Sequence, residues 1–293
     1  MNDLTKDPRD KGHKGDFPPQ SQEQPGLTST TIPAPDHGEQ TYVGSNRLKN
    51  LKALVTGGDS GIGRAVSIAF SREGADVAFT YLKEEEADAK KTKEWIDKAG
   101  RRSLPIATDL REEKNCIESI EKTVSTLGGL DVLIINAGYQ KERKGIENIS
   151  SVELDRVFKT NLYAAVWLAR EAVPHLHAGS SIITTTSIQA SSPSPDLIDY
   201  AMTKAALVAF TQALAQELTP RGIRVNAVAP GPIWTPLIPG TGWDEKLEKF
   251  GQSTPMGRAG QPAELAGAYV FLASPDSSYI SGAVIPVTGG RIF

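Results

Sequence analysis

The sequence predicts an α/β fold, a single doubly wound domain with a parallel sheet of about seven strands and helices on both faces. Short apolar runs alternate with amphipathic or charged helical patterns from residue 51 onward. Strands joined by helices form βαβ units, which build parallel sheets. The runs are apolar almost throughout, as expected for strands that are buried on both faces. The 293 residues, 39% hydrophobic and 23% charged, have the composition of an ordinary globular protein.

The first half of this domain contains three strand–helix units. ALVTGG (53–58) is a short apolar run that ends in glycines, and the helical stretch GRAVSIAFSREG (63–74) follows it. DVAFTY (76–81) precedes the charged helix EEEADAKKTKEWIDKAG (84–100). SLPIATDL (103–110) precedes CIESIEKTVSTLG (116–128). Such short apolar runs, each followed by a helical pattern, indicate strands of βαβ units.

Four further strands complete the sheet. DVLIINAG (131–138), SIITTTS (181–187) and IRVNAVAPG (223–231) are separated by helical stretches, one of them the apolar AALVAFTQALAQEL (205–218). GAVIPVTGG (282–290) is a last short strand. Ligands of such sheets bind beyond the carboxyl ends of the strands, where the strand order reverses. The residues at the strand ends are therefore the first candidates for a functional site.

Residues 1–49 form a proline-rich extension, called the leader below, ahead of a domain that we place at 50–293. The leader contains six prolines and few apolar residues, and no helical or strand period persists in it. It is either a disordered tail or an extended arm anchored by Phe17, Leu27, Ile32, Tyr42 and Val43. Ordering such a segment costs about 1–2 kcal/mol per residue in backbone entropy, which only distributed burial offsets. We predict that 32–46 is ordered against the domain and that the first dozen residues are mobile.

Composition and charge exclude several classes of function. The net charge of −3 gives no basic field for nucleic acid. Cys116, the only cysteine, has no disulfide partner, and His175 and His177 have no carboxylate or cysteine array beside them, so we assign no metal site. The amino-terminal residues lack the apolar core of a signal peptide, and no run is long enough to span a bilayer. The sequence therefore predicts a cytoplasmic protein without membrane or nucleic-acid partners.

The end of the first strand carries a glycine-rich turn, TGGDSGIGRA (56–65). Gly57, Gly61 and Gly63 stand where a tight turn leads into a helix. Without Cβ atoms, they let backbone N–H groups approach a pyrophosphate, whose charge the helix N-terminus also favours. The spacing Gly-x3-Gly-x-Gly differs from the common dinucleotide fingerprint Gly-x-Gly-x2-Gly.

Tyr200 and Lys204 lie four positions apart and therefore on one face of a helix, thirteen residues after Ser187. A free tyrosine titrates near pH 10, and a nearby ammonium group favours its phenolate and lowers its pKa. Tyr200 is then suited to exchange a proton with a substrate oxygen that the Ser187 hydroxyl also holds. This arrangement predicts acid–base chemistry on a carbonyl or alcohol.

Together with the glycine turn, these residues resemble the short-chain dehydrogenase/reductase family, over roughly residues 50–293. Asn136-Ala137-Gly138 is similar to the family's Asn-Asn-Ala-Gly, with Ile135 in place of the first asparagine, and Tyr200 to Lys204 is its Tyr-x3-Lys. The leader and AVAPGPIWTP (227–236) resemble a bacterial subgroup described as glucose/ribitol dehydrogenase-like or NADP-dependent aldehyde reductases. The resemblance implies a Rossmann-type NAD(P)-binding domain and a homotetramer.

The resemblance also implies the site residues. The catalytic residues are Asn161, Ser187, Tyr200 and Lys204, with Asn161 holding a water that links Lys204 to solvent. Lys204 also reaches the nicotinamide ribose, and Asp109 lies near the adenine. The expected cofactor-binding residues are Gly57, Asp59, Ser60, Gly61, Ile62, Gly63, Tyr81, Lys83, Asp109, Leu110, Asn136, Ala137, Gly138, Tyr200, Lys204, Pro230, Gly231, Ile233 and Thr235.

The choice between NADP and NAD rests on the end of the second strand. NAD-selecting sites carry Asp or Glu there for the ribose hydroxyls, whereas this chain has Tyr81, with Lys83 and Arg64 as candidate partners of a 2′-phosphate. Ser60, however, stands before Gly61, where NADP-using relatives often have a basic residue. The balance favours NADP(H), with NAD(H) as the alternative.

The expected function is hydride transfer between NAD(P)(H) and a small aldehyde, sugar or polyol. The alternatives are reduction of a 3-oxoacyl thioester and a nucleotide-binding regulator without turnover. Trp234 and Trp243 flank a Pro/Gly-rich loop, WTPLIPGTGW (234–243), and are either substrate-lid residues or packing anchors. The sequence does not identify the substrate or the favoured direction.

Overall fold

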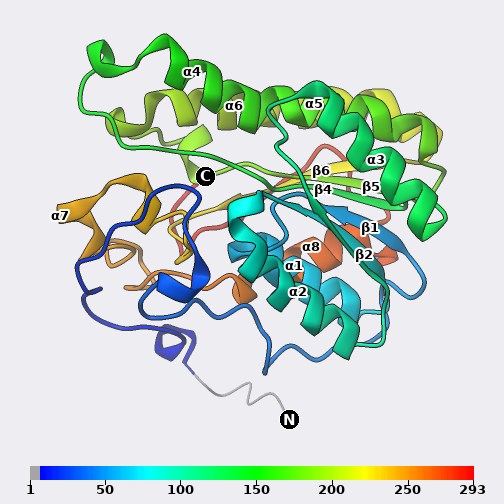
Figure 1. The fold of residues 1–293 in the computed structure, drawn as a ribbon, viewed down its shortest axis with the longest axis horizontal. Helices are drawn as coiled ribbons and strands as arrows, with labels where there is room; N and C mark the ends of the chain where they lie inside the picture. Colours follow the sequence, from blue (N-terminus) through cyan, green and yellow to red (C-terminus); the bar gives the residue numbers. More distant parts are fainter. Residues whose placement is uncertain (1–6) are drawn as a thin grey trace.

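The computed structural model describes residues 7–293, and in this range seven strands form one parallel sheet in the order β3-β2-β1-β4-β5-β6-β7 (Figure 1). The predicted α/β class, strand number and helical layers are confirmed. The strands are β1 (Lys52–Val55), β2 (Asp76–Tyr81), β3 (Ser103–Ala107), β4 (Val132–Ile135), β5 (Ser181–Thr185), β6 (Arg224–Pro230) and β7 (Val284–Val287).

Helices cover both faces of the sheet (Figure 1). On one face lie α1 (Gly61–Arg72), α2 (Glu86–Lys98) and α8 (Ala263–Ala273). On the other lie α3 (Glu113–Leu127), α4 (Ser151–Phe158), α5 (Ala164–Ala172) and α6 (Ile198–Leu218), with a π-helical turn (Lys159–Tyr163) joining α4 to α5. Each face has its own buried apolar cluster, as a sheet between two helical layers requires. A short helix, α7 (Asp244–Leu247), lies in the segment after β6.

Most strands end earlier than the apolar runs suggested. β1 ends at Val55, β4 at Ile135 and β5 at Thr185, so the last residues of the predicted strands leave the sheet. These residues form the loops at the carboxyl ends of the strands. They are the residues with candidate functions, because only backbone released from the ladder can turn toward a ligand. The described residues include no helix long and apolar enough to cross a membrane.

The leader follows the outside of the domain beside the segment that carries α7 (Figure 1). The predicted order of 32–46 is confirmed, since the Tyr42 hydroxyl donates to Glu73 Oε1 at 2.6 Å and the Ser45 amide to Glu73 Oε2 at 2.8 Å. Of the expected anchors Phe17 is buried, whereas Ile32 and Val43 are exposed, so the expectation that these two anchor the leader is wrong. Of the first dozen residues, 1–6 lie outside the described range, and Pro8, expected to be mobile, accepts a hydrogen bond from Arg258.

Candidate active site

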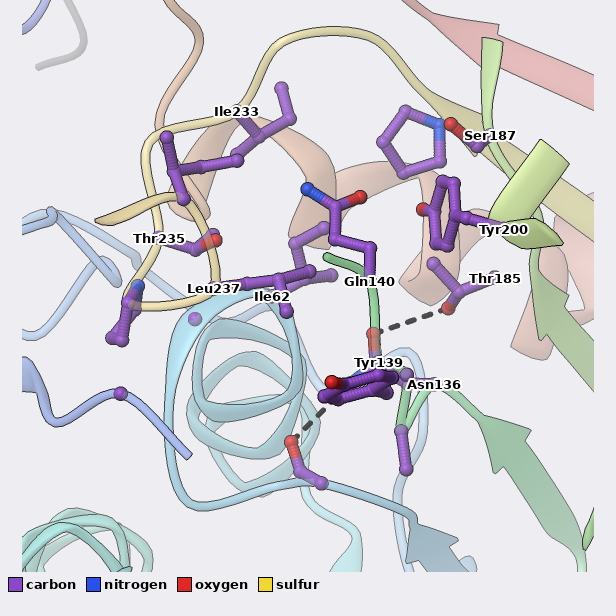
Figure 2. Close-up of a pocket in the computed structure, with 18 of the residues that line it drawn as sticks. Ile62, Asn136, Tyr139, Gln140, Thr185, Ser187, Tyr200, Ile233, Thr235 and Leu237 are labelled. Atoms are coloured by element: carbon purple, nitrogen blue, oxygen red, sulfur yellow. Dashed lines mark hydrogen bonds between the residues drawn. The ribbon is translucent and has the colours of Figure 1, made fainter. Parts of the chain in front are cut away.

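A cavity of about 650 Å³ lies at the carboxyl ends of the strands. The loops after β1, β4, β5 and β6 line it, and β1 and β4 are neighbours in the sheet although two strands separate them in sequence. This is the position where the strand order reverses and where ligands of doubly wound sheets bind. Figure 2 shows side chains from these loops facing one another across the cavity.

The glycine-rich turn has the close packing that a phosphate cradle needs. Gly57 and Gly61 have φ angles of +60° and +50°, which L side chains rarely adopt. A Cβ on Gly63 would lie 1.9 Å from the Gly57 carbonyl oxygen, so Gly63 lets α1 start directly beneath the turn. Gly57, Asp59, Ser60, Gly61 and Ile62 line the cavity, whereas Gly63 supports it from below. The first turn of α1 therefore offers its N–H groups to an anion, and the residues fit a dinucleotide pyrophosphate.

Asn136 joins the strands around this cradle. Its amide group donates to the carbonyl of Thr56 at 3.1 Å and accepts from the Thr185 hydroxyl at 3.2 Å, the bond drawn in Figure 2. The Thr56 hydroxyl in turn accepts the backbone N–H groups of Asn136 and Ala137, at 2.8 and 3.0 Å. These bonds hold the ends of β1, β4 and β5 at fixed separations beneath the cavity.

Tyr200 and Lys204 lie in the first two turns of α6, both buried and both lining the cavity. Lys204 Nζ donates to the Thr185 carbonyl at 2.8 Å and lies 5.4 Å from the centre of the Tyr200 ring. Burial lowers the pKa of Lys204 to about 8 and raises the pKa of Tyr200 to about 12. The expected lowering of the Tyr200 pKa is thus wrong for the protein chain alone, because burial of the phenolate raises that pKa.

Ser187 follows β5 and begins a 3-10 turn, Ile188–Ala190, whose Gln189 amide it accepts at 3.2 Å. Its hydroxyl also interacts favourably with the Tyr200 phenolate, which opposes the rise in the pKa of that phenol. Figure 2 shows the two side chains next to each other at the same end of the cavity. A substrate oxygen placed there would meet both hydroxyl groups.

Asn161 lies behind the cavity wall, in the π-helical turn between α4 and α5. Its Oδ1 accepts the Tyr139 amide at 2.7 Å, and its Nδ2 donates to the Tyr139 carbonyl and to the Thr203 hydroxyl, at 2.9 and 3.1 Å. The side chain therefore fixes the loop after β4 to α6. A Cβ on Gly138 would lie 3.6 Å from Lys204 Nζ and 3.7 Å from Asn161 Oδ1, so both polar groups lie close to Gly138. The water expected at Asn161 stays a prediction.

Arg64 was expected as a candidate partner of a 2′-phosphate at the ribose end of the cavity, but its side chain is bonded elsewhere. Its guanidinium pairs with Asp88 at 2.7 Å and donates to the Asp59 carbonyl, buried beneath the glycine turn. Arg64 therefore braces the loop and is not placed to meet a 2′-phosphate. Tyr81 lines the cavity and donates to Glu86 at 2.6 Å, whereas Lys83 lines a smaller hollow that adjoins it.

Two acidic groups face this end of the cavity, and only Asp59 was expected from the sequence. Burial raises the pKa of Asp59 to about 7 and that of Glu85 to about 8. Asp59 Oδ2 is buried without a hydrogen-bond partner among the described residues. At neutral pH Glu85 is therefore mostly protonated and Asp59 about half protonated, which reduces their repulsion of a bound phosphate.

The remaining cofactor candidates border the same cavity. Asp109 is held by Arg111 through a 2.9 Å contact, which lowers the pKa of its carboxyl, and Leu110 is buried beside it. Ala137 and Gly138 line the cavity after β4, and Pro230, Gly231, Ile233 and Thr235 line it after β6. The structure thus brings every expected cofactor residue to the cavity except Gly63, which supports it, and Lys83, at the adjoining hollow.

Several lining residues could not be recognised from the sequence. Tyr139, Gln140, Thr185 and Leu237 all contribute to the wall, and Figure 2 labels all four. Their sequence signals are weak: Tyr139 and Gln140 follow the predicted strand 131–138, Thr185 is the last residue of β5, and Leu237 lies within the 234–243 loop. Both readings of the tryptophans apply, because Trp243 lines the cavity while Trp234 is fully buried as a packing anchor.

Comparisons with known proteins agree with this geometry. Residues 57–291 match the family described as enoyl-(acyl carrier protein) reductase. The chain is 51% identical to the uncharacterized oxidoreductase YghA of Escherichia coli (strain K12), over 98% of each chain, so this match includes the leader. It is 49% identical to a glucose and ribitol dehydrogenase of Daucus carota, over 95% of this chain and 98% of the other.

Two further comparisons concern the cofactor. The chain is 47% identical to the chloroplastic NADPH-dependent aldehyde reductase 1 of Arabidopsis thaliana, over 92% of this chain and 96% of the other. The crystal structure of a short-chain dehydrogenase from Burkholderia cenocepacia J2315 in complex with NADP superposes with a TM-score of 0.78 at 32% identity, covering 83% of this chain and 98% of that one. The fold, the cradle, the Ser–Tyr–Lys set and these similarities agree, and the chain belongs to the short-chain dehydrogenase/reductase family of oxidoreductases.

Proposed function

We propose that this oxidoreductase uses NADP(H) to interconvert a small carbonyl compound and its alcohol, where the substrate is an aldehyde, a sugar or a polyol. The observation that carries the proposal is that Ser187, Tyr200 and Lys204 line the same cavity as the glycine cradle. The relatives named for glucose and ribitol and for aldehydes support the substrate class, and those named for NADP and NADPH support the cofactor. Proposed boundaries are 1–49 for the leader and 50–293 for the catalytic domain.

The chain supplies the proton transfer, while a bound nicotinamide would supply or accept the hydride. The Ser187 hydroxyl holds the substrate oxygen, and the Tyr200 hydroxyl gives that oxygen a proton as it gains negative charge. Lys204, fixed by the Thr185 carbonyl, favours the tyrosinate that is left. With a pKa near 12, Tyr200 is almost entirely protonated at neutral pH, so the oxidation direction, which needs the tyrosinate, depends most on this cation.

The lining of the substrate end fits a small polar molecule. Gln140, Gln189 and Ser194 provide amide and hydroxyl groups, and Trp243 and Phe250 provide apolar surface. Lys246 of α7 pairs with Glu142 and Asp196, which holds the segment carrying Trp243 across the opening. An oxygen-rich substrate is recognised through such fixed polar groups more strongly than through apolar area.

Replacement of Tyr200 by Phe tests the proposal. It deletes the proton donor without changing the cavity shape, so we expect turnover to fall at least about a hundredfold, the usual contribution of acid–base catalysis, with NADPH affinity within a few-fold of wild type. The measurement is nicotinamide absorbance during reduction of aldehydes and sugars and oxidation of polyols, with both cofactors. Strong activity on 3-oxoacyl thioesters alone would instead favour the thioester reductase, and binding without any turnover in the wild type would favour a regulator.

We further propose a homotetramer in the cytoplasm. Large apolar side chains are exposed on α4 and on the π turn and α5, at Val152, Leu154, Tyr163 and Val166. A row of this kind suits a two-fold interface between copies of the chain. Light scattering should give a mass near four chains of 31.4 kDa, and Val166→Glu should lower it. A monomer at micromolar concentration in the wild type would contradict the assembly.

A further inference from the structure

Residues Gln24, Pro25 and Gly26 of the leader, called the strap below, line the cavity together with the glycine cradle and the loop after β6. We propose that the strap is part of the cofactor site and that Gln24 is a positioning residue that holds the site closed over the dinucleotide. The inference rests on the proposed nicotinamide cofactor. It gives the leader a role in binding in addition to the stability expected of a packed arm.

The first observation is a set of hydrogen bonds that crosses the opening of the cavity. Gln24 Nε2 donates to the Gln140 carbonyl, in the loop after β4, and to the Gly240 carbonyl at 2.8 Å, in the loop after β6. Gln140 Nε2 continues the connection by donating to the Thr241 hydroxyl at 2.8 Å. One leader side chain therefore joins the two loops that face each other across the site, and Figure 2 shows Gln140 in the gap between Ile62 and Tyr200.

The second observation is that the receiving surface is shaped for the strap. A Cβ on Gly26 would lie 2.4 Å from the Pro236 carbonyl oxygen, and a Cβ on Gly240 would lie 2.8 Å from Gln24 Cγ. At both positions a larger residue would collide with a neighbour, and it is this close contact rather than a positive φ angle that favours glycine. Pro236 and its neighbour Thr235 also border Gly61, since a Cβ there would meet Thr235 at 3.2 Å and Pro236 at 3.9 Å. The strap is therefore separated from the phosphate cradle by a single layer of side chains.

The third observation is the extent of the cavity that the strap covers. Gln24 and Pro25 also line the adjoining hollow, together with Leu82 and Asp109 at the ends of β2 and β3. The strap thus runs from the adenosine end to the loop beside the catalytic end. A dinucleotide lying along this cavity would have the carboxyl ends of the strands on one side and the strap on the other. Its release would therefore require the Gln24 hydrogen bonds to break.

The experiment compares NADPH binding by the full-length wild type, Gln24→Ala and Gln20→Ala. NADPH fluorescence gives the dissociation constant, and displacement by excess NADP⁺ in a stopped-flow instrument gives the release rate. Gln20 is a matched control because the hydrogen bonds that its side-chain amide makes to described residues all stay within the leader, to Pro18 and Ile32. Loss of the two Gln24 bonds is expected to speed release about tenfold, the equivalent of roughly one net hydrogen bond, while Gln20→Ala stays within twofold of wild type.

Gly26→Ala provides a second variant whose effect has a different physical origin. Its Cβ would displace the strap from Pro236, so release should accelerate although Gln24 is intact. Unchanged release in Gln24→Ala, or equal acceleration in Gln20→Ala, would overturn the role of the strap. A wild-type chain that does not bind NADPH or NADH would instead overturn the proposed function, so the two failures are distinguishable.

Discussion

Lys204 carries its ammonium group into a buried position where, among residues 7–293, Nζ donates only to the Thr185 carbonyl. Burial lowers its pKa from 10.5 to about 8, so keeping it charged at pH 7 costs about 3 kcal/mol by the usual conversion. The chain tolerates this cost because an ammonium at this position favours the Tyr200 phenolate. Activity and stability are therefore in opposition at this residue.

Replacing Lys204 by Met should separate the two properties. The variant should lose turnover but gain roughly 1–2 kcal/mol of unfolding free energy at pH 7, since the lost bond to Thr185 offsets part of the relief. Below pH 8 the lysine is protonated in both states, and between about pH 8 and 10.5 the unfolded chain binds more protons. Wild-type stability should therefore rise with pH across that window. Urea unfolding at pH 7 and pH 9.5 tests both points, and a Met variant less stable than wild type at pH 7 would contradict the argument.

At the scale of elements, the loop after β1 and the turn before α2 combine to set the charge at the ribose end. Asp59 and Glu85 face the cavity, while Arg64 and Asp88 compensate each other beneath it. With pKa values near 7 and 8, the two carboxyls gain negative charge as the pH rises through this range. That charge acts on a 2′-phosphate more than on a 2′-hydroxyl.

The affinity for NADPH should therefore weaken about tenfold between pH 6.5 and pH 8.5, and the affinity for NADH should weaken less. Glu85→Gln removes one of the two titrating groups and should flatten the NADPH profile. Fluorescence titrations of both proteins across this range provide the measurement. A wild-type dissociation constant that does not change with pH would show that these carboxyls do not sense the phosphate.

The same elements show what could be predicted from the sequence. Gly57, Ser187, Tyr200 and Lys204 follow from spacing and strand ends, because short-range backbone geometry fixes them once the fold is known. The roles of Arg64 and Glu85 could not be predicted, since they depend on which side chains α2 places beneath the loop after β1. Burial also reversed the expected shift of the Tyr200 pKa. Desolvation is a property of the packed molecule and is not visible in local sequence.

At the scale of the whole molecule, the leader adds a separate apolar cluster to the two that flank the sheet. Phe17 stacks on Trp234 with 3.8 Å between ring centroids, and Ile238, Leu247 and Ala259 surround them. The Trp234 indole N–H also donates to the Pro33 carbonyl at 2.7 Å. The leader thus covers the segment after β6 that forms one wall of the active site.

Phe17→Ala should loosen the leader as a unit. Removal of a buried phenyl ring costs about 3–5 kcal/mol where the site cannot collapse, and here the cost falls on the contact between leader and domain. Hydrogen exchange should therefore become faster across 17–46, together with a lower melting temperature, while β1 and β4 keep their protection. Ile32→Ala serves as the matched control, because Ile32 is 61% exposed and its loss removes little buried area. If exchange in the leader were equally fast in wild type and Phe17→Ala, the leader would not be anchored through this ring.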